Sequence, residues 1–231
     1  MKKIYLIIFL ALFFPPIVFS HQPRLVKDVH VVVENPEVSQ AFYDELTGQP
    51  DRYSIQSEKP FSLFVSILVP DLPFVKTDIS ARITRRGDPS FLVLLDGRTH
   101  AWEVYYEKHA GDSYLTGPSF QAKDSSSSFH PKGVQVEAGE YEILVSSPGN
   151  MGKYILVVGE KEEFPLQEIV HTVLEVPKIK NYFNKSTWSA FSTPTMIGFL
   201  GITVCFIAVF LGIVIWGGRK MYHVIKRSRV R

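Results

Sequence analysis

The stretch of sequence that decides the fold runs from residue 139 to residue 159 and reads GEYEILVSSPGNMGKYILVVG. Every second side chain in each half is large and apolar: Tyr141, Ile143 and Val145, then Tyr154, Leu156 and Val158. A period of two is typical of β-strands. The sequence Pro-Gly-Asn at 148–150 separates the two halves and favours a tight turn. The stretch therefore predicts an antiparallel β-hairpin.

The same alternation recurs through residues 21–160. Further candidate strands lie at 29–34, 41–46, 53–56, 61–69, 79–84, 91–95, 102–106 and 134–137. About ten short strands with frequent turns and no helices between them indicate an antiparallel β-sandwich or jelly roll. Residues 108–132 contain two glycines and a run of four serines, so we expect a long surface loop there, with at most a short strand at 119–122. The fold class is mainly β.

The pattern changes in residues 161–194. The apolar side chains from Phe164 to Leu174 follow helical spacing, which predicts a short amphipathic helix over 165–176. We expect Pro177 to end it, followed by a juxtamembrane stem. Two placements are open for this helix: it packs against its own sandwich, which we favour, or it lies on a membrane surface.

Residues 1–20 have the features of a secretory signal peptide. Lys2 and Lys3 precede an uncharged apolar run of 11 residues, and Ser20 is a small residue suited to cleavage before His21. The run is too short to cross a bilayer core, which needs about 20 helical residues. The alternative is an uncleaved N-terminal anchor, which Pro15 and Pro16 disfavour.

A second apolar segment, residues 195–217, is long enough to span a membrane. Its part from Met196 to Trp216 has no charge and would form about 31 Å of helix. Six basic and no acidic residues follow it, in the tail 218–231. By the positive-inside rule this tail lies in the cytoplasm, and the signal peptide independently places residues 21–194 outside. We therefore expect a single-pass protein of the cell membrane, in contact with membrane lipid.

The charge distribution argues against a nucleic-acid partner. Residues 21–194 contain 17 Lys and Arg against all 23 Asp and Glu, a net charge of −6. Binding to phosphates needs a basic face, which this part of the chain does not provide.

Residues 137–159 resemble the last hairpin of bacterial pre-peptidase C-terminal domains. The similarity lies in Gly-x-Tyr at 139–141, which opens one strand, and Gly-x-Tyr-x-Leu at 152–156, which opens the next. Residues 42–69 resemble an early hairpin of the same domains. The resemblance extends to uncharacterised prokaryotic membrane-anchored proteins that carry them. It implies a small jelly-roll sandwich on an exported prokaryotic protein, and no calcium or collagen contacts carry over, because no matching acidic cluster is present.

Motifs for catalysis are missing from the sequence. It has no Gly-x-Ser-x-Gly, His-Glu-x-x-His, phosphate-binding loop or dinucleotide fingerprint, and Cys205 falls in the apolar segment. We expect no enzyme activity, and we assign no catalytic, cofactor-binding or metal-binding residue and no cofactor. A hydrolase without a recognisable motif is the alternative.

One metal hypothesis follows from the cleavage site. A mature N-terminal His21 would offer its amine and imidazole to copper, as in a histidine brace, with one more histidine as the third ligand. The candidates for that third ligand are His30, His100, His109, His130 and His171.

The favoured function is a membrane-anchored, extracytoplasmic binding or assembly module without catalytic activity. Its expected partner is a protein or glycan of the cell envelope. Aromatic residues in and around the expected loop are the candidate contact surface, because aromatic side chains dominate interface hot spots: Trp102, Tyr105, Tyr106, Tyr114 and Phe120. Trp102 has the alternative of lying in the sandwich core.

Overall fold

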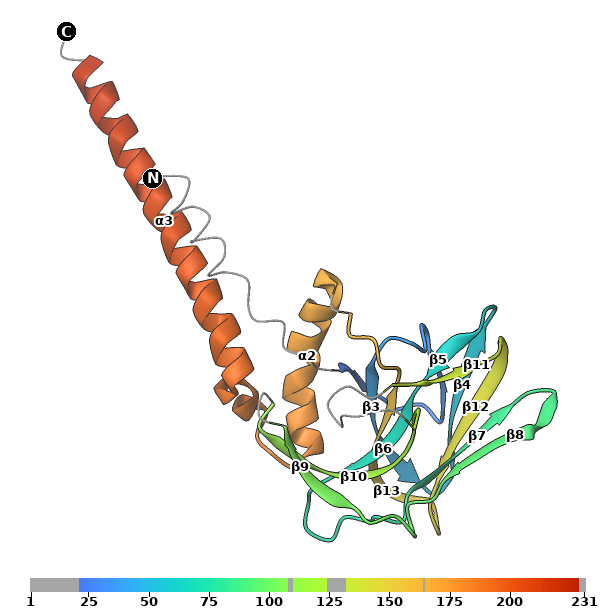
Figure 1. Ribbon diagram of the computed structural model, residues 1–231. Coiled ribbons are helices and arrows are strands. Elements are labelled where there is room, and N and C mark those ends of the chain that lie inside the picture. The colour runs from blue at the N-terminus through green and yellow to red at the C-terminus, as the bar shows by residue number, and fades with distance from the viewer. Residues whose placement is uncertain (1–20, 108–109, 124–131, 164, 229–231) are drawn as a thin grey trace. The chain divides into compact units, whose positions relative to one another are not determined.

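The computed structural model describes residues 21–107, 110–123, 132–163 and 165–228. The predicted signal peptide, residues 1–20, lies outside the described residues. The chain divides into two compact units, one within residues 19–190 and one that contains residues 191–228. Each unit is described separately here (Figure 1).

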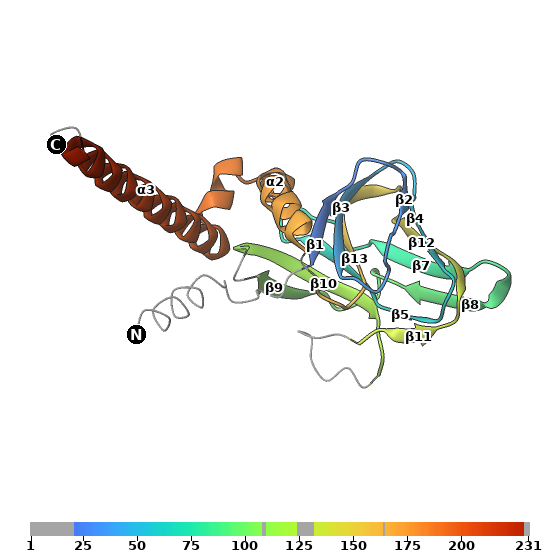
Figure 2. The same cartoon turned by 90° about the horizontal axis from the view of Figure 1, so that it is seen from above.

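The first unit is built mainly from two β-sheets that face one another (Figures 1 and 2). In spatial order, the first sheet contains β1 (Gln22–Leu25), β3 (Gln40–Thr47), β13 (Met151–Val158), β6 (Val65–Pro70), β10 (Asp112–Phe120) and β9 (Glu103–Glu107). The second sheet contains β2 (His30–Val32), β4 (Asp51–Ser57), β12 (Gly139–Ser146), β7 (Ser80–Arg85) and β8 (Asp88–Leu95). A two-stranded sheet pairs β5 (Phe61–Leu63) with β11 (Val134–Val136).

The main hydrophobic core lies between the two large sheets. Leu46, Ile67 and Leu156 from the first sheet are fully buried against Ile83 and Ile143 from the second. Burial of each such side chain contributes about 1.5–3 kcal/mol. This confirms the mainly β sandwich that the alternating pattern predicts.

The two strands predicted from residues 139–159 are present as β12 and β13, but the predicted hairpin is wrong: β12 pairs with β4 and β7, β13 pairs with β3 and β6, and the turn between them crosses from one sheet to the other. Tyr141 and Tyr154 point into the core, and Gly149 and Asn150 occupy the left-handed conformations that the turn requires. The consecutive residues Ile155 and Leu156 are both buried, because β13 is covered on both of its faces.

A second hydrophobic cluster covers the outer face of the first sheet. Tyr43, Tyr114 and Ile155 from the sheet cluster with Tyr182, at the end of the following helix, and with Phe183, the residue after it. This helix, α2, runs from Leu166 to Tyr182. It therefore packs on its own sandwich, which is the placement that the sequence analysis favours.

The expected end of this helix is wrong. Pro177 lies inside α2, which continues to Tyr182. A proline removes one helical hydrogen bond and crowds the preceding turn. The last turn persists because Ile179 and Lys180 are buried against the sheet, and this packing outweighs the local penalty.

The expected loop at 108–132 is also wrong over part of its length. Residues Asp112–Phe120 form β10, paired with both β6 and β9. The register shifts between Thr116 and Ser119, around the glycine and proline that make the segment resemble a loop. Gly117 is required there, because a Cβ at this position would lie 2.6 Å from the ring of Trp102. Residues 124–131 of the expected loop lie outside the described residues.

Strand bounds differ from the prediction at two further places. The expected strand 61–69 is split into β5 and β6 by Phe64, whose side chain joins the outer cluster while Leu63 and Val65 face the core. The short strand β1 was not predicted. β1 pairs with β3, and β2 pairs with β4, in parallel, so the sandwich is not purely antiparallel. Residues 22–32 therefore cross from the edge of one sheet to the edge of the other.

The second unit is dominated by a single helix, α3, from Pro194 to Ser228. Its part from Leu200 to Lys220 is long and apolar enough to cross a membrane, by length and composition, and none of that window is buried in protein. A short 3-10 helix, η1 (Thr187–Ser192), precedes it.

Candidate functional site

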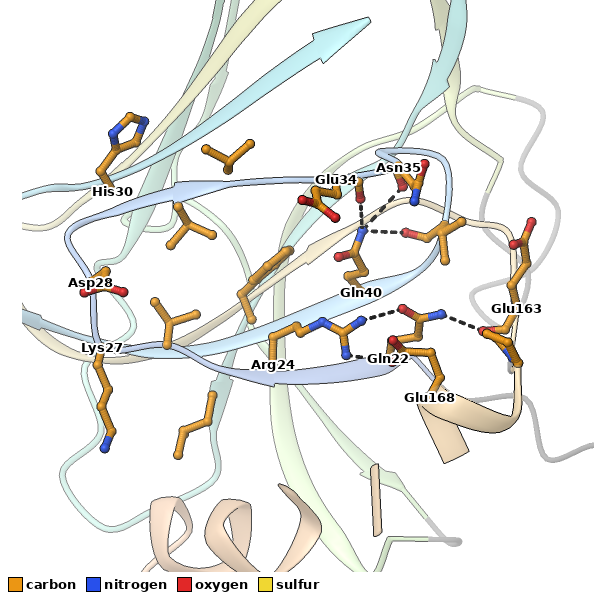
Figure 3. A pocket seen from close by; sticks show the side chains of 17 residues that line it. Gln22, Arg24, Lys27, Asp28, His30, Glu34, Asn35, Gln40, Glu163 and Glu168 are labelled. Atoms are coloured by element: carbon orange, nitrogen blue, oxygen red, sulfur yellow. Dashed lines mark hydrogen bonds and ion pairs between the residues drawn. The ribbon is translucent and has the colours of Figure 1, made fainter. Parts of the chain in front are cut away.

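A cavity of about 680 Å³ opens where the chain crosses between the two sheet edges (Figure 3). Its walls are β1, β2 and the connections around them, together with the start of α2. The parallel pairing of β1 and β2 creates this space, because the crossing segment arches over the open edge of the sandwich. Its apolar lining includes Leu25, Val31, Val38 and Phe42.

Arg24 is the central polar group of the cavity. Its guanidinium donates to Glu168 Oε2 at 2.9 Å and to Gln22 Oε1 at 2.8 Å. Gln22 in turn donates to the backbone carbonyl of Glu163 at 2.6 Å (Figure 3). These bonds hold the guanidinium plane in one orientation, and they tie the first turn of α2 to β1.

Gln40 forms a second fixed polar group on the opposite wall. Its amide nitrogen donates to the backbone carbonyls of Glu34, Asn35 and Val38, at 2.7, 3.4 and 3.4 Å. The residue is only 6% exposed, so this amide is held rigidly. The side chain of Gln40 therefore clamps the turn that forms one end of the cavity.

The lining carries more negative than positive charge. Asp28, Glu34, Glu163 and Glu168 contribute four carboxylates, against the two cations Arg24 and Lys27. The described lining residues include no serine, threonine, cysteine or tyrosine that could act as a nucleophile. The four carboxylates can accept hydrogen bonds from hydroxyl, amide or amine groups.

A second group of polar side chains lies inside the sandwich. Tyr154 donates to Asp51 Oδ2 at 2.8 Å, and Tyr53 donates to Asp44 Oδ2 at 2.9 Å. The hydroxyl oxygen of Tyr154 also lies 3.2 Å from the same Asp44 oxygen. Burial raises the pKa of Asp51 to about 6, and burial also raises the pKa of Asp44. The tyrosine hydroxyls satisfy both carboxyl groups, so this network is part of the packed core.

The predicted aromatic contact surface is only partly exposed. Tyr105 and Tyr106 on β9 are 38% and 59% exposed. Tyr114 is buried against Phe183, which removes it from any contact surface. Trp102 and Phe120 pack against the main core, which agrees with the alternative left open for Trp102.

The histidines that the structure describes do not form a metal centre. Within the described residues, no group of three or more His, Cys, Asp and Glu could hold a metal ion. His21 Nδ1, the ring nitrogen that would chelate copper together with the N-terminal amine, lies 2.5 Å from Ser39 Oγ. His30 contacts Ser54 Oγ, and His109 and His130 lie outside the described residues.

The sequence analysis missed the cavity. Gln22 and Arg24 lie far in sequence from Gln40 and Glu168, and the four residues belong to no motif. One signal was available, because Gln22 and Gln40 are polar residues next to apolar strand positions, and buried amides need internal partners. The sequence does not show which groups these amides bond to, because that depends on how residues 22–32 cross between the two sheets.

A scan against models of protein families gives no match, and a search of curated proteins gives none. A search of solved structures finds the pre-peptidase C-terminal domain of a collagenase from Bacillus anthracis. The two chains are 7% identical, with a TM-score of 0.29, over 61% of this chain and 97% of that chain. This is the family that the hairpin motifs resemble, but a TM-score this low carries no argument about function.

Proposed function

We propose that the chain is a single-pass membrane protein whose β-sandwich acts outside the cytoplasm as a non-catalytic binding or assembly module. The observation that carries the proposal is the pair of units. One is a packed sandwich with a polar cavity, and the other holds an apolar stretch, Leu200–Lys220, whose most apolar window is not buried by the described residues. A helix of this length and composition is stable when lipid surrounds it.

The orientation follows from charge. Six basic residues and no acidic residue occupy the last 13 positions, which follow the uncharged run Met196–Trp216. The positive-inside rule assigns this end to the cytoplasm and the sandwich to the opposite side.

The cavity is the proposed ligand site. Its excess of carboxylates suits a ligand that donates hydrogen bonds, such as a glycan hydroxyl or an amide of an envelope protein, and the fixed guanidinium of Arg24 suits an acceptor oxygen of the same ligand. The partner that we propose is accordingly a protein or glycan of the cell envelope.

Topology is tested by thiol accessibility on whole cells, in a Cys205→Ser background. Glu58→Cys, in an exposed turn of the sandwich, should react with a membrane-impermeant reagent, after permeabilisation of an outer membrane where the host has one. Ser228→Cys in the tail should not react. The reverse pattern would overturn the orientation.

Binding is tested by photo-cross-linking of the full chain in its own membranes. A photoreactive residue at Val32, on the rim of the cavity and 66% exposed, should form an adduct with an envelope protein or glycan. Leu92, at the opposite edge of the same sheet and 60% exposed, is the matched control and should not form that adduct. Arg24→Ala should abolish the adduct at Val32. An identical adduct at both positions, or one that survives Arg24→Ala, would contradict the cavity as the site.

A further inference from the structure

The edge strand β9 exposes apolar side chains between its two terminal glutamates. Val104 and Tyr106 are 69% and 59% exposed, and β9 pairs with β10 alone (Figure 1). Edge strands of soluble domains are usually protected by charges, bulges or a covering element. Exposed apolar residues on an edge strand therefore mark a surface that another apolar phase or partner covers.

The stem, residues 183–193 between α2 and α3, is attached beside this strand. Lys185 Nζ donates to the carbonyl of Gly111 at 2.9 Å and to Asp112 Oδ1 at 2.7 Å, in the segment where β10 begins. The hydroxyl of Tyr106 approaches the same glycine, at 3.9 Å from the position of a Cβ. Three residues after Lys185, the side chain of Trp188 is 78% exposed. Tyr106 and Lys185 thus lie beside the same residue, Gly111, and Trp188 follows three residues later in the chain.

Chain length places this edge close to the proposed membrane span. The 3-10 helix Thr187–Ser192 rises about 12 Å, at roughly 2 Å per residue. From Pro194 to Leu200, α3 adds about 9 Å at 1.5 Å per residue. The two residue steps between these helices add at most about 7 Å, so Trp188 is within about 24 Å of the first residue of the apolar stretch along the chain. Trp and Tyr side chains are enriched in the interfacial layer that borders such a stretch.

We propose that Val104, Tyr106 and Trp188 form a lipid-contacting face that rests in the headgroup layer and fixes the sandwich on the membrane surface. This inference rests on the proposed membrane anchoring. The occupant is lipid because the stem at this edge continues directly into the span.

Two other arrangements are less consistent with the residues. A second copy pairing antiparallel through β9 about its centre would set Glu103 opposite Glu107, and like charges directly opposite are destabilising. The open face of α2 carries Val170 and Leu174, but polar residues surround them: Gln167, His171, Lys178 and Asn181.

The test uses the full chain reconstituted in phosphatidylcholine vesicles, with single cysteines in a Cys205→Ser background. The cysteines carry an environment-sensitive fluorophore, and the vesicles contain a lipid-borne quencher either in the headgroup region or deep in the acyl chains. The variants are Tyr106→Cys and Trp188→Cys on the proposed face, Leu174→Cys on α2, Leu92→Cys as the exposed apolar control and Phe210→Cys in α3.

We expect the headgroup quencher to reduce fluorescence at positions 106 and 188 by about twofold or more relative to position 92. Position 174 should behave like position 92. The deep quencher should act at position 210, which reports anchoring. If position 210 is quenched while position 106 is not, the lipid-contacting face is refuted and the anchor stands. If position 174 is quenched in place of 106, α2 is the contacting face. If position 210 is not quenched, the proposed anchoring itself fails.

Discussion

The attachment of α2 to the sandwich depends on a buried ion pair that can be tested directly. Lys180 Nζ and Asp112 Oδ2 are 2.5 Å apart, and both side chains are only 2% exposed. Lys180 also donates to the carbonyl of Ala110 at 2.6 Å. The second oxygen of Asp112 accepts from Lys185, whose side chain is 42% exposed. One carboxylate therefore joins the last turn of α2 and the stem to β10.

Asp112→Asn keeps the shape of the side chain but removes its charge. Lys185 can then turn to solvent, whereas the ammonium of Lys180 stays buried without a counter-charge. Breaking a buried pair by removing one partner costs about 3–5 kcal/mol. Because the carbonyl of Ala110 and the new amide oxygen still accept hydrogen bonds, we expect a loss of about 3 kcal/mol in the free energy of unfolding. That is a large fraction of the total stability of a typical domain, about 5–15 kcal/mol.

Two further variants separate charge burial from general damage. The double variant Asp112→Asn, Lys180→Met removes both buried charges and should recover most of the loss, since apolar replacements of buried pairs are often close to neutral. Lys178→Met is the matched control on the same helix, because Lys178 is 59% exposed and its ion pair is with Glu175, one turn earlier in α2. Its cost should stay below about 0.5 kcal/mol.

The assay is urea denaturation of the full chain in mild detergent, followed by the fluorescence of Trp102 with the other two tryptophans replaced by phenylalanine. Trp102 reports the sandwich, because it packs against the core and donates to the carbonyl of Gly97. If Asp112→Asn costs no more than Lys178→Met, or if the double variant is less stable than the single one, the reasoning about the buried pair is wrong.

Three other predictions concern the sandwich. Residues 21–194, made without either apolar segment, should form a soluble monomer whose far-ultraviolet circular dichroism is dominated by β-structure; a spectrum dominated by helix would contradict the fold. The pKa of Asp51 is raised to about 6 by burial, so its contribution to stability is present below about pH 4 and lost as the pH rises through about 6. Asp51→Asn should therefore gain about 1–2 kcal/mol relative to the wild type between pH 4 and pH 8 in urea titrations, after allowance for solvent screening; a constant difference would argue against the raised pKa. The mature protein should begin at His21 and bind Cu(II) only weakly by calorimetry, and one added N-terminal alanine should leave that binding unchanged. Tight binding that is lost both with the added alanine and in His21→Ala would establish the copper site.

The sequence predicts a strand well where one face of the strand is exposed and the other is buried in the core. In β12, Tyr141, Ile143 and Val145 are buried, and alternating polar residues face away from the core, so a period of two identifies the strand. The turn at 148–150 follows from residues that tolerate left-handed backbone conformations, although the strands on its two sides enter different sheets. Both signals are local, and tertiary packing agrees with them.

The errors arise where packing overrides a local signal. Gly117 and Pro118 indicate a loop, yet Gly117 serves to admit the ring of Trp102 against the backbone of β10. Pro177 indicates a helix end, yet Ile179 and Lys180 hold the last turn of α2 on the sheet. The partners of these residues lie tens of positions away, and a single sequence does not show which distant segment will meet them. The cavity was missed for the same reason, since Arg24 and Glu168 are 144 positions apart.

The two ends of α2 contact different parts of the sandwich, and this limits how far the cavity can lie from the stem. Glu168 in its first turn pairs with Arg24 in the cavity, while Lys180 in its last turn is fixed to β10 beside the stem. From Glu168 to Tyr182 the helix rises about 21 Å. With the stem edge resting on the headgroups, as proposed, the cavity would be held no more than a few tens of ångströms from the membrane surface. A ligand at that height belongs to the innermost part of the envelope, which favours a partner that is itself membrane-bound or attached at the base of the envelope over one that diffuses freely outside the cell.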